Sequence, residues 1–157
     1  MRTQAPQLAI SRVFNAPRTL VYQAFTDPDH LASWWGPTGN LLPRDDIDFD
    51  VRPGGYLRWV EVNPTHPGLR VHVHIDLTEV ADSELLEGVM RVSGRLPEGF
   101  GPFETRLRVE FHDEADARTR LEIRQWLPEH LAHPAEEGWR QAFAKLATML
   151  SNVQPVK

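Results

Sequence analysis

Residues 33–40, SWWGPTGN, place two tryptophans side by side directly before a Gly-Pro pair. Such a pair does not continue a helix, so a helix that reaches this point is expected to end here. Asp27-Pro28 provides its start, with a capping side chain followed by proline at the first helical position. Leu31, Trp34 and Trp35 then follow at i, i+3 and i+4 spacing, which puts both rings within one broad face. The sequence therefore predicts a short helix that presents two rings beside a loop.

A strand and another helix are expected before this segment. Residues 8–15, LAISRVFN, alternate as a strand does, and Arg12 shares the phase of the apolar side chains. Asn15-Ala16-Pro17 then supplies a capping side chain and a proline for a helix with apolar positions over residues 20–25. The order strand, helix, short helix is therefore predicted for the first quarter of the chain.

Strands dominate the middle of the chain, and one long helix is expected to follow them. Alternation of apolar and polar side chains predicts strands at 44–51, 56–62, 71–76, 84–92, 104–111 and 119–126. Such alternation is typical of an antiparallel sheet with one face in water and one face covered. Residues 134–152 carry an apolar stripe at helical spacing, formed by Trp139, Ala142, Phe143, Leu146, Met149 and Leu150. A helix of this length spans roughly 28 Å, enough to cover a curved sheet, so the fold class is α+β.

Composition excludes several classes of protein. The 157 residues suit one domain, which we place at 1–157. A net charge of −5 without a basic cluster argues against nucleic acid and against an anionic membrane as partners. No apolar run approaches the roughly 20 residues of a membrane span, and no signal peptide is apparent, so a cytoplasmic protein is expected. With no cysteine, no phosphate-binding loop and no dinucleotide fingerprint, no cofactor is expected.

The order and spacing of these motifs resemble a known family over nearly the whole chain. The chain is similar to the bacterial relatives of the activator of the ninety-kilodalton heat-shock protein's ATPase, within the START-like, helix-grip (SRPBCC) superfamily. The matching segments are Ala16-Pro17, Val21, residues 26–28, Leu31, residues 34–37, residues 52–55, Gly138-Trp139, Phe143 and Leu146. The resemblance implies a helix-grip fold, in which a curved antiparallel sheet wraps around the long C-terminal helix. It also implies a choice of functions: apolar-ligand binding, polyketide cyclase-like activity or a co-chaperone role.

Aromatic side chains are expected to gather between the sheet and the last helix. Large aromatic residues dominate core energetics, so core packing alone is one explanation. A long helix over a strongly curved sheet also tends to leave space, and a concave apolar pocket with few polar groups is the usual ligand site. On this second interpretation the apolar wall is formed by Trp34, Trp35, Trp59, Trp139 and Phe143, with Met90 beside them.

Polar side chains that would orient a ligand are fewer. We expect Tyr56 and Arg12 to serve this purpose, and Gln125 shares the phase of its apolar neighbours. The strand 56–62 leaves two phases open, with either its odd-numbered or its even-numbered side chains facing inward. If Glu61 is inside it needs a partner, for which Arg12 is the natural candidate, and it would then suit acid–base chemistry. The alternative is that Glu61 and Arg12 lie near strand ends and reach water.

Two further motifs, a histidine pattern on one strand and a Gly/Pro-rich loop, could point to a metal site and to a lid over the pocket. His72, His74 and Asp76 have metal-like spacing on one strand face, but the opposite phase is apolar, so we expect them on the outer face without a metal. Residues 94–103 form a Gly/Pro-rich loop in which Phe100 and Phe103 serve either as a lid over a pocket or as ordinary packing at the sheet edge.

The leading hypothesis is that the protein binds a small apolar or aromatic molecule between the sheet and the last helix. The first alternative is an interaction module, as a stress-linked co-chaperone with a chaperone partner or as a homodimer. The second is an enzyme of the cyclase or hydratase type, with Glu61 or Tyr56 as the titratable group. Whether the protein is an enzyme is left open at this point.

Overall fold

The computed structural model describes residues 5–96, 98 and 101–153. In this part of the chain, seven strands form one antiparallel sheet in the order β1-β7-β6-β5-β4-β3-β2. Their bounds are β1 Leu8–Phe14, β2 Asp48–Asp50, β3 Tyr56–Val62, β4 Arg70–Ala81, β5 Leu85–Arg95, β6 Phe103–Glu114 and β7 Arg118–Trp126. The first strand pairs with the last strand of the sheet, so β1 forms the edge beside β7.

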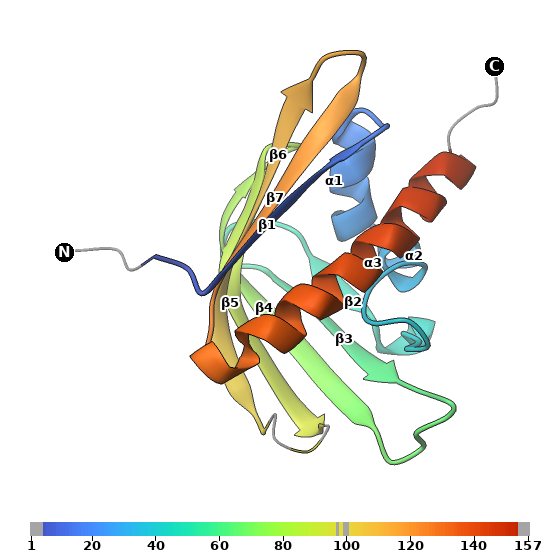
Figure 1. Cartoon of the computed structure of the whole chain (residues 1–157), viewed down its shortest axis with the longest axis vertical. Coiled ribbons are helices and arrows are strands. Elements are labelled where there is room, and N and C mark those ends of the chain that lie inside the picture. Colours follow the sequence, from blue (N-terminus) through green and yellow to red (C-terminus); the bar gives the residue numbers. More distant parts are fainter. Residues whose placement is uncertain (1–4, 97, 99–100, 154–157) are drawn as a thin grey trace.

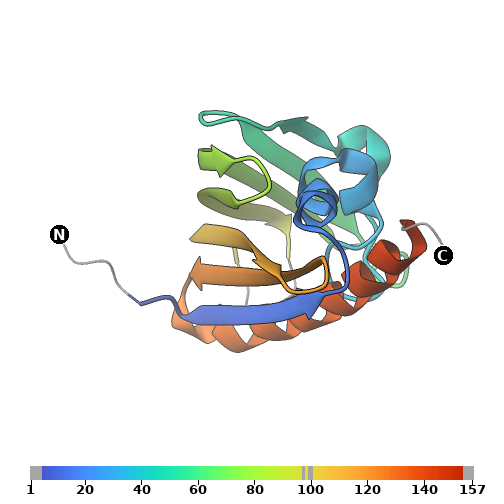
Figure 2. The same cartoon turned by 90° about the horizontal axis from the view of Figure 1, so that it is seen from above.

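The helices lie on the concave side of this sheet (Figure 1). Their bounds are α1 Arg18–Thr26, α2 Pro28–Ala32, the 3-10 turns η1 Arg44–Asp46 and η2 Glu129–Leu131, and α3 Ala132–Val153. Seen from above, the sheet curves around them, and α3 runs along its β1 side (Figure 2). The predicted α+β helix-grip fold, with two short helices after the first strand, is confirmed.

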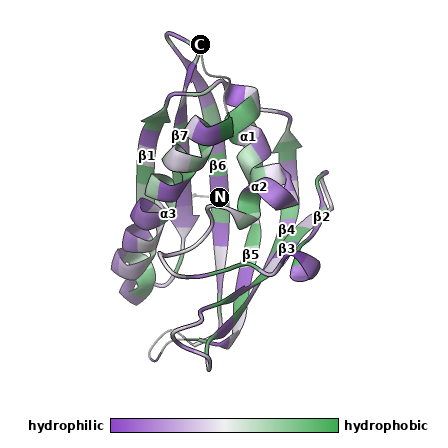
Figure 3. Cartoon of the chain, turned by 90° about the vertical axis from the view of Figure 1, so that its right-hand side faces the viewer, coloured by the Kyte–Doolittle hydropathy of each residue, from purple (hydrophilic) through white to green (hydrophobic). Residues whose placement is uncertain are grey.

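The alternating patterns of the sequence explain which faces are buried. In β4, Val71, Val73 and Ile75 are buried, whereas His72 is exposed and His74 half-buried. Figure 3 shows this alternation as bands of opposite hydropathy along the strands. The cause is the two-residue period of a strand, which sends successive side chains to opposite faces.

The predicted apolar stripe of the last helix is confirmed, since all six of its residues are buried. The helix is longer than expected at both ends, beginning at Ala132 directly after η2. Its opposite side is polar, as in an amphipathic helix packed on a sheet. No helix among the described residues combines the length and the apolar composition required to cross a membrane.

Two local predictions are wrong. The strand expected at 44–51 is reduced to Asp48–Asp50, because Arg44–Asp46 close a 3-10 turn in which the backbone N–H of Ile47 donates to the Arg44 carbonyl. Helix α1 begins after Pro17, which occupies the N-cap position without a side-chain cap. In residues 44–51, the alternation of acidic and apolar side chains therefore indicated a strand only over Asp48–Asp50.

Candidate ligand-binding site

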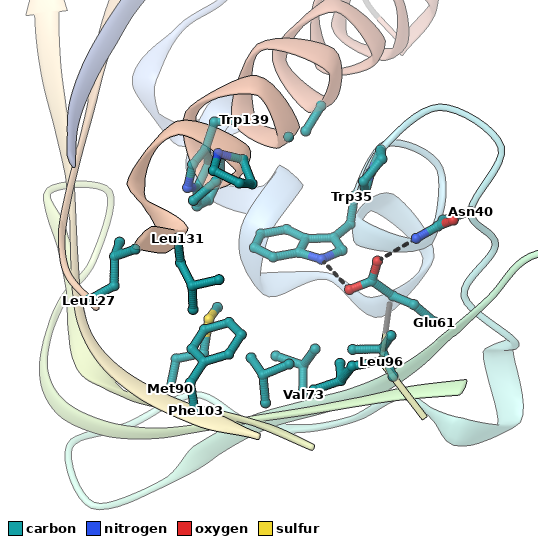
Figure 4. Close-up of a pocket in the computed structure, with 18 of the residues that line it drawn as sticks. Trp35, Asn40, Glu61, Val73, Met90, Leu96, Phe103, Leu127, Leu131 and Trp139 are labelled. Carbon is teal, nitrogen blue, oxygen red and sulfur yellow. Dashed lines mark hydrogen bonds between the residues drawn. The ribbon is translucent and has the colours of Figure 1, made fainter. Parts of the chain in front are cut away.

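A cavity with a volume of about 220 Å³ lies between the sheet and α3 (Figure 4). Strands β3 to β7 contribute its floor, and η2 with the first half of α3 contributes its roof. Its wall is mainly apolar, with Val73, Met90, Phe103, Leu127, Leu131 and Trp139 among its members. The cavity is partly open to solvent, so a small molecule has a route into it.

The two adjacent tryptophans diverge at the end of α2. Trp34 is fully buried, and its indole N–H donates to the Ala24 carbonyl across 2.8 Å. Trp35 is half-buried, and its ring faces the cavity (Figure 4). The backbone N–H of Trp35 still donates to the Leu31 carbonyl, so the helical turn persists until Gly36 turns the chain at a φ of +84°. One ring therefore completes the core, and the other closes one end of the cavity.

Trp35 is the centre of an aromatic cluster. Its ring centroid lies 5.5 Å from Trp34, 4.8 Å from Trp59 and 5.1 Å from Trp139, in edge-to-face arrangements. Edge-to-face pairs of this kind contribute about 0.5–1.5 kcal/mol each beyond the area they bury. The cluster thereby joins the turn after α2 to β3 and α3 and holds the Trp35 ring in place.

Of the five residues predicted to form the apolar wall, Trp35 and Trp139 line the cavity. Trp34, Trp59 and Phe143 are core residues that lie behind this wall. Phe143, for example, packs against Phe14 with a centroid separation of 5.5 Å. The two interpretations of the aromatic residues, core packing and pocket lining, thus hold for different members of the set.

The predicted placement of Tyr56 and Arg12 in the cavity is wrong. The Tyr56 hydroxyl donates to Asp48 Oδ2 on the outer face, because the even-numbered side chains of β3 point away from the helices. Arg12 has the inward phase, but β1 is an edge strand and its side chain lies beside Ala147 near the C-terminal end of α3. Its guanidinium extends over the Phe14 ring and reaches water.

Glu61 is the acidic side chain that enters the cavity, which settles the phase of β3. It is 7% exposed, and its Oε2 accepts a hydrogen bond of 3.1 Å from Trp35 Nε1. Its Oε1 accepts one of 3.0 Å from Asn40 Nδ2 (Figure 4). These two donors, rather than Arg12, are its partners. Burial raises the pKa of the Glu61 carboxyl, and the donors Asn40, Trp35 and Trp59 with the charge of Lys145 offset only part of this effect.

Two polar residues beside Glu61 were missed by the sequence analysis. Asn40 lies in the SWWGPTGN loop, and its Oδ1 accepts from Asn63 Nδ2, which orients the amide toward Glu61. Lys145 of α3 donates from Nζ to the carbonyls of Trp35 and Pro37, at 3.2 Å each. Burial lowers the pKa of Lys145, and the charge of Glu61 acts in the opposite direction. The sequence pattern around Asn40 and Lys145 gave no indication that either residue would lie beside Glu61.

Gln125 of β7 is the other buried polar side chain in the wall. Its Oε1 accepts a hydrogen bond of 2.9 Å from Trp139 Nε1, which fixes the orientation of the amide because an indole N–H only donates. Its Nε2 is directed to Met90 Sδ at 3.9 Å, a weak acceptor. Trp139 is therefore held in place from the sheet, as Trp35 is held by Glu61.

The histidine motif of β4 lies on the outer face, as predicted. His74 Nε2 is 2.9 Å from Asp76 Oδ1, and Asp76 also pairs with Arg91. On the same face, ligand atoms of Glu110, His112 and Glu122 lie within 4.8 Å of one another. Arginine side chains pair with both of these glutamates.

The loop at 94–103 is described only in part. Phe103 lines the cavity, whereas Phe100 lies outside the described residues. The lid therefore stays a prediction.

Comparison with known proteins identifies the family. Residues 15–151 match the family described as "Activator of Hsp90 ATPase homolog 1-like protein". The chain belongs to this family. The match spans α1 to α3, so it includes every residue named above as part of the cavity. No match was found among curated proteins.

Several solved structures share the fold of this chain. A protein from Chromobacterium violaceum is 22% identical, with a TM-score of 0.78 over 91% of this chain and 95% of its own. A protein from Mycobacterium smegmatis is 22% identical, with a TM-score of 0.76 over 93% and 91%. The AHSA1 protein from Silicibacter pomeroyi is 25% identical, with a TM-score of 0.75 over 94% and 99%. Together with the family match, these similarities support the START-like, helix-grip (SRPBCC) superfamily.

Proposed function

We propose that this protein binds a small apolar or aromatic molecule in the cavity between α3 and the sheet. The observation that carries the proposal is the cavity itself, with its volume of about 220 Å³ and its largely apolar wall. An engineered apolar cavity of about 150 Å³ in another protein holds benzene. By that comparison there is room here for one or two fused rings, and each CH₂ removed from water contributes about 0.8 kcal/mol.

Contacts within the protein hold the wall of the cavity in place, which supports binding to a preformed site. Trp35 is fixed by Glu61 and by its neighbouring rings, and Trp139 is fixed by Gln125. The loop before β2 is fastened to α3, since the Thr38 backbone N–H donates to Gln141 Oε1 across 2.9 Å. A rigid, preformed site loses less conformational entropy on binding than a mobile one.

A pair of matched variants tests the proposal. Ala142 lines the cavity, whereas Ala144 is exposed on the other side of the same helix. Ala142→Phe fills the cavity, and Ala144→Phe adds the same ring at the surface. Titration with the neutral fluorescent probe Nile red should show saturable binding to the wild type and to Ala144→Phe, and at least tenfold weaker binding to Ala142→Phe. Equal affinity of the three proteins would place the probe elsewhere and reject the proposal.

Gly138→Leu provides a second variant, which is expected to disturb the packing of the core less than Ala142→Phe does. Gly138 lines the cavity, and a Cβ at this position meets no atom within 4 Å. A leucine there extends into open space, so the fold should tolerate it while the cavity narrows. Weaker probe binding with an unchanged circular dichroism spectrum is expected. Unchanged probe binding would count against the cavity as the site.

An enzyme of the cyclase or hydratase type is the second candidate, and the position of Glu61 favours it. Such chemistry requires a titratable group inside the cavity, and Glu61 lies there with a raised pKa. The test is exchange of the hydrogen next to a carbonyl in D₂O, followed by NMR, with the small aromatic ketone 2-tetralone. Acceleration by the wild type and not by Glu61→Gln is expected of an enzyme. Exchange at the buffer rate with both proteins would reject this candidate.

A further inference from the structure

The polar groups of the cavity differ in how much hydrogen-bonding capacity they retain. The indole N–H groups of Trp35 and Trp139 are both donated, and Asn40 uses its amide toward Glu61 and Asn63. A carboxylate has about four lone-pair positions; the hydrogen bonds from Trp35 and Asn40 occupy two of them, and the buried Trp59 indole is a third neighbouring donor. Glu61 therefore retains acceptor capacity at the edge of an otherwise apolar space.

Donors surround the Glu61 carboxyl. From the loop after α2 come the Trp35 indole and the Asn40 amide. From α3, Lys145 contributes its positive charge, while its Nζ donates to backbone carbonyls of the same loop. Across the sheet, Glu61 is opposite Val71 of β4, which brings no charge. The donors and the positive charge around Glu61 favour its ionised form, in which the carboxyl only accepts hydrogen bonds, whereas burial acts in the opposite direction and raises its pKa.

The backbone restricts where a ligand can meet the carboxyl. A Cβ at Gly36 would lie 2.7 Å from Glu61 Oε1, so the turn is packed directly against that oxygen. Oε2 is the oxygen bound to Trp35, whose ring borders the cavity (Figure 4). A ligand that lies against the Trp35 ring thus approaches Oε2 first.

We infer that the ligand is an apolar ring compound that carries one N–H or O–H donor, and that this donor binds Glu61 Oε2 while the ring lies against Trp35 and Trp139. This inference rests on the proposed function, because it names the chemical class that the same cavity selects. A compound that only accepts hydrogen bonds brings its oxygen against a carboxylate and buries it without a donor, which is unfavourable. A donor compound instead places a proton where the carboxylate can accept it.

Matched compounds with one skeleton test the inference. They are 2-naphthol, with an O–H donor; 2-(aminomethyl)naphthalene, with a cationic N–H donor; 2-methoxynaphthalene, which only accepts; and naphthalene, with neither. Displacement of Nile red, checked by calorimetry, should give at least tenfold tighter binding of one donor compound than of 2-methoxynaphthalene. The two donor compounds distinguish a neutral hydroxyl from a cationic amine as the preferred donor.

The variant Glu61→Gln and a matched control complete the experiment. In Glu61→Gln the preference for donors should fall below about threefold, whereas Glu79→Gln, an exposed change on β4, should keep it. For 2-naphthol, binding to the wild type should weaken as the pH falls through the pKa of Glu61, because the protonated carboxyl is a weaker acceptor and carries its own O–H donor. Binding to Glu61→Gln should not change over the same range.

The outcomes separate the two proposals. If naphthalene, 2-methoxynaphthalene and the donor compounds bind the wild type with equal affinity, the cavity binds apolar molecules and the inference about Glu61 is overturned. A donor preference that persists in Glu61→Gln overturns it as well. If no compound binds and Ala142→Phe has no effect on the probe, the proposed function fails together with the inference.

Discussion

Trp35 Nε1 donates a hydrogen bond of 3.1 Å to Glu61 Oε2, joining the turn after α2 to the end of β3. This bond places the polar atom of an aromatic wall and the buried acid of a strand at the same end of one cavity. It also gives the carboxylate a partner, without which its burial would be costly. The apolar surface and the chemistry of the site therefore depend on one contact between distant segments.

The two adjacent tryptophans should have separable effects. Trp34→Phe leaves the buried Ala24 carbonyl without its donor, so we expect a loss of about 1–3 kcal/mol in the free energy of unfolding with Nile red affinity retained. Trp35→Phe should weaken probe binding and also lower the free energy of unfolding, because it changes a ring that lines the cavity and removes one donor to the buried Glu61 carboxyl. Urea denaturation and probe titration measure both quantities. Weaker probe binding by Trp34→Phe together with unchanged binding by Trp35→Phe would contradict the assignment of Trp34 to the core and Trp35 to the cavity.

The buried acid predicts a pH dependence of stability. The pKa of Glu61 in the folded protein is raised above its ordinary value of 4.5. The folded state then binds the proton more tightly than the unfolded state, so stability is lost as the pH rises from about 4.5 through the raised pKa. Urea denaturation across this range should show the loss in the wild type and not in Glu61→Gln. Parallel curves for the two proteins would show that the carboxyl titrates normally.

Glu110 on the outer face predicts the opposite sign. Burial acts to raise the pKa of Glu110, but hydrogen bonds from Arg108 and His112 outweigh it and lower the pKa to about 2. Its contribution to stability is present above pH 4.5 and is lost as the pH falls toward about 2. We expect Glu110→Gln to be less stable than the wild type at neutral pH, and the difference to shrink in acid. Chemical denaturation at the two pH values measures it, and a difference independent of pH would exclude this source.

Two glycines with free space around the missing side chain should respond differently to alanine. A Cβ at Gly138 or at Gly54 meets no atom within 4 Å, but Gly54 has a φ of +84°. Gly138→Ala, inside α3, should raise the free energy of unfolding by up to about 1 kcal/mol, because alanine is the better helix former. Gly54→Ala should lower it by about 1–2 kcal/mol, since a side chain strains the left-handed conformation. Thermal or urea unfolding checks both, and equal effects would contradict this explanation.

Patterns within single elements made much of the fold predictable. The stripe of residues 134–152 and the alternation in β4 each follow from the period of one helix or strand. The strand 56–62 could not be placed in the same way, because apolar side chains occur in both phases and Val60 is buried as well as Trp59. The structure selects the phase that buries Glu61, because Asn40 and Trp35 supply donors on that side.

The site residues show the same limit. Trp35 and Trp139 were identified from their positions on helices, whereas Arg12 was misplaced because a strand's phase does not tell how far a covering helix extends. Asn40 and Lys145 carry no periodic signal that links them to Glu61. They approach it only because the loop after α2 folds onto α3.

The sequence alone determined the order of most elements and, for strands such as β4 and for the last helix, the face that would be buried, because both depend on spacings of two to four residues. The tertiary structure alone decided which of two neighbouring indoles completes the core and which borders the cavity. It alone placed an acid beside the second indole, 26 residues away in the chain. The physical reason is that a buried carboxylate is stable only where donors from other segments meet it, and such meetings depend on how the whole chain closes.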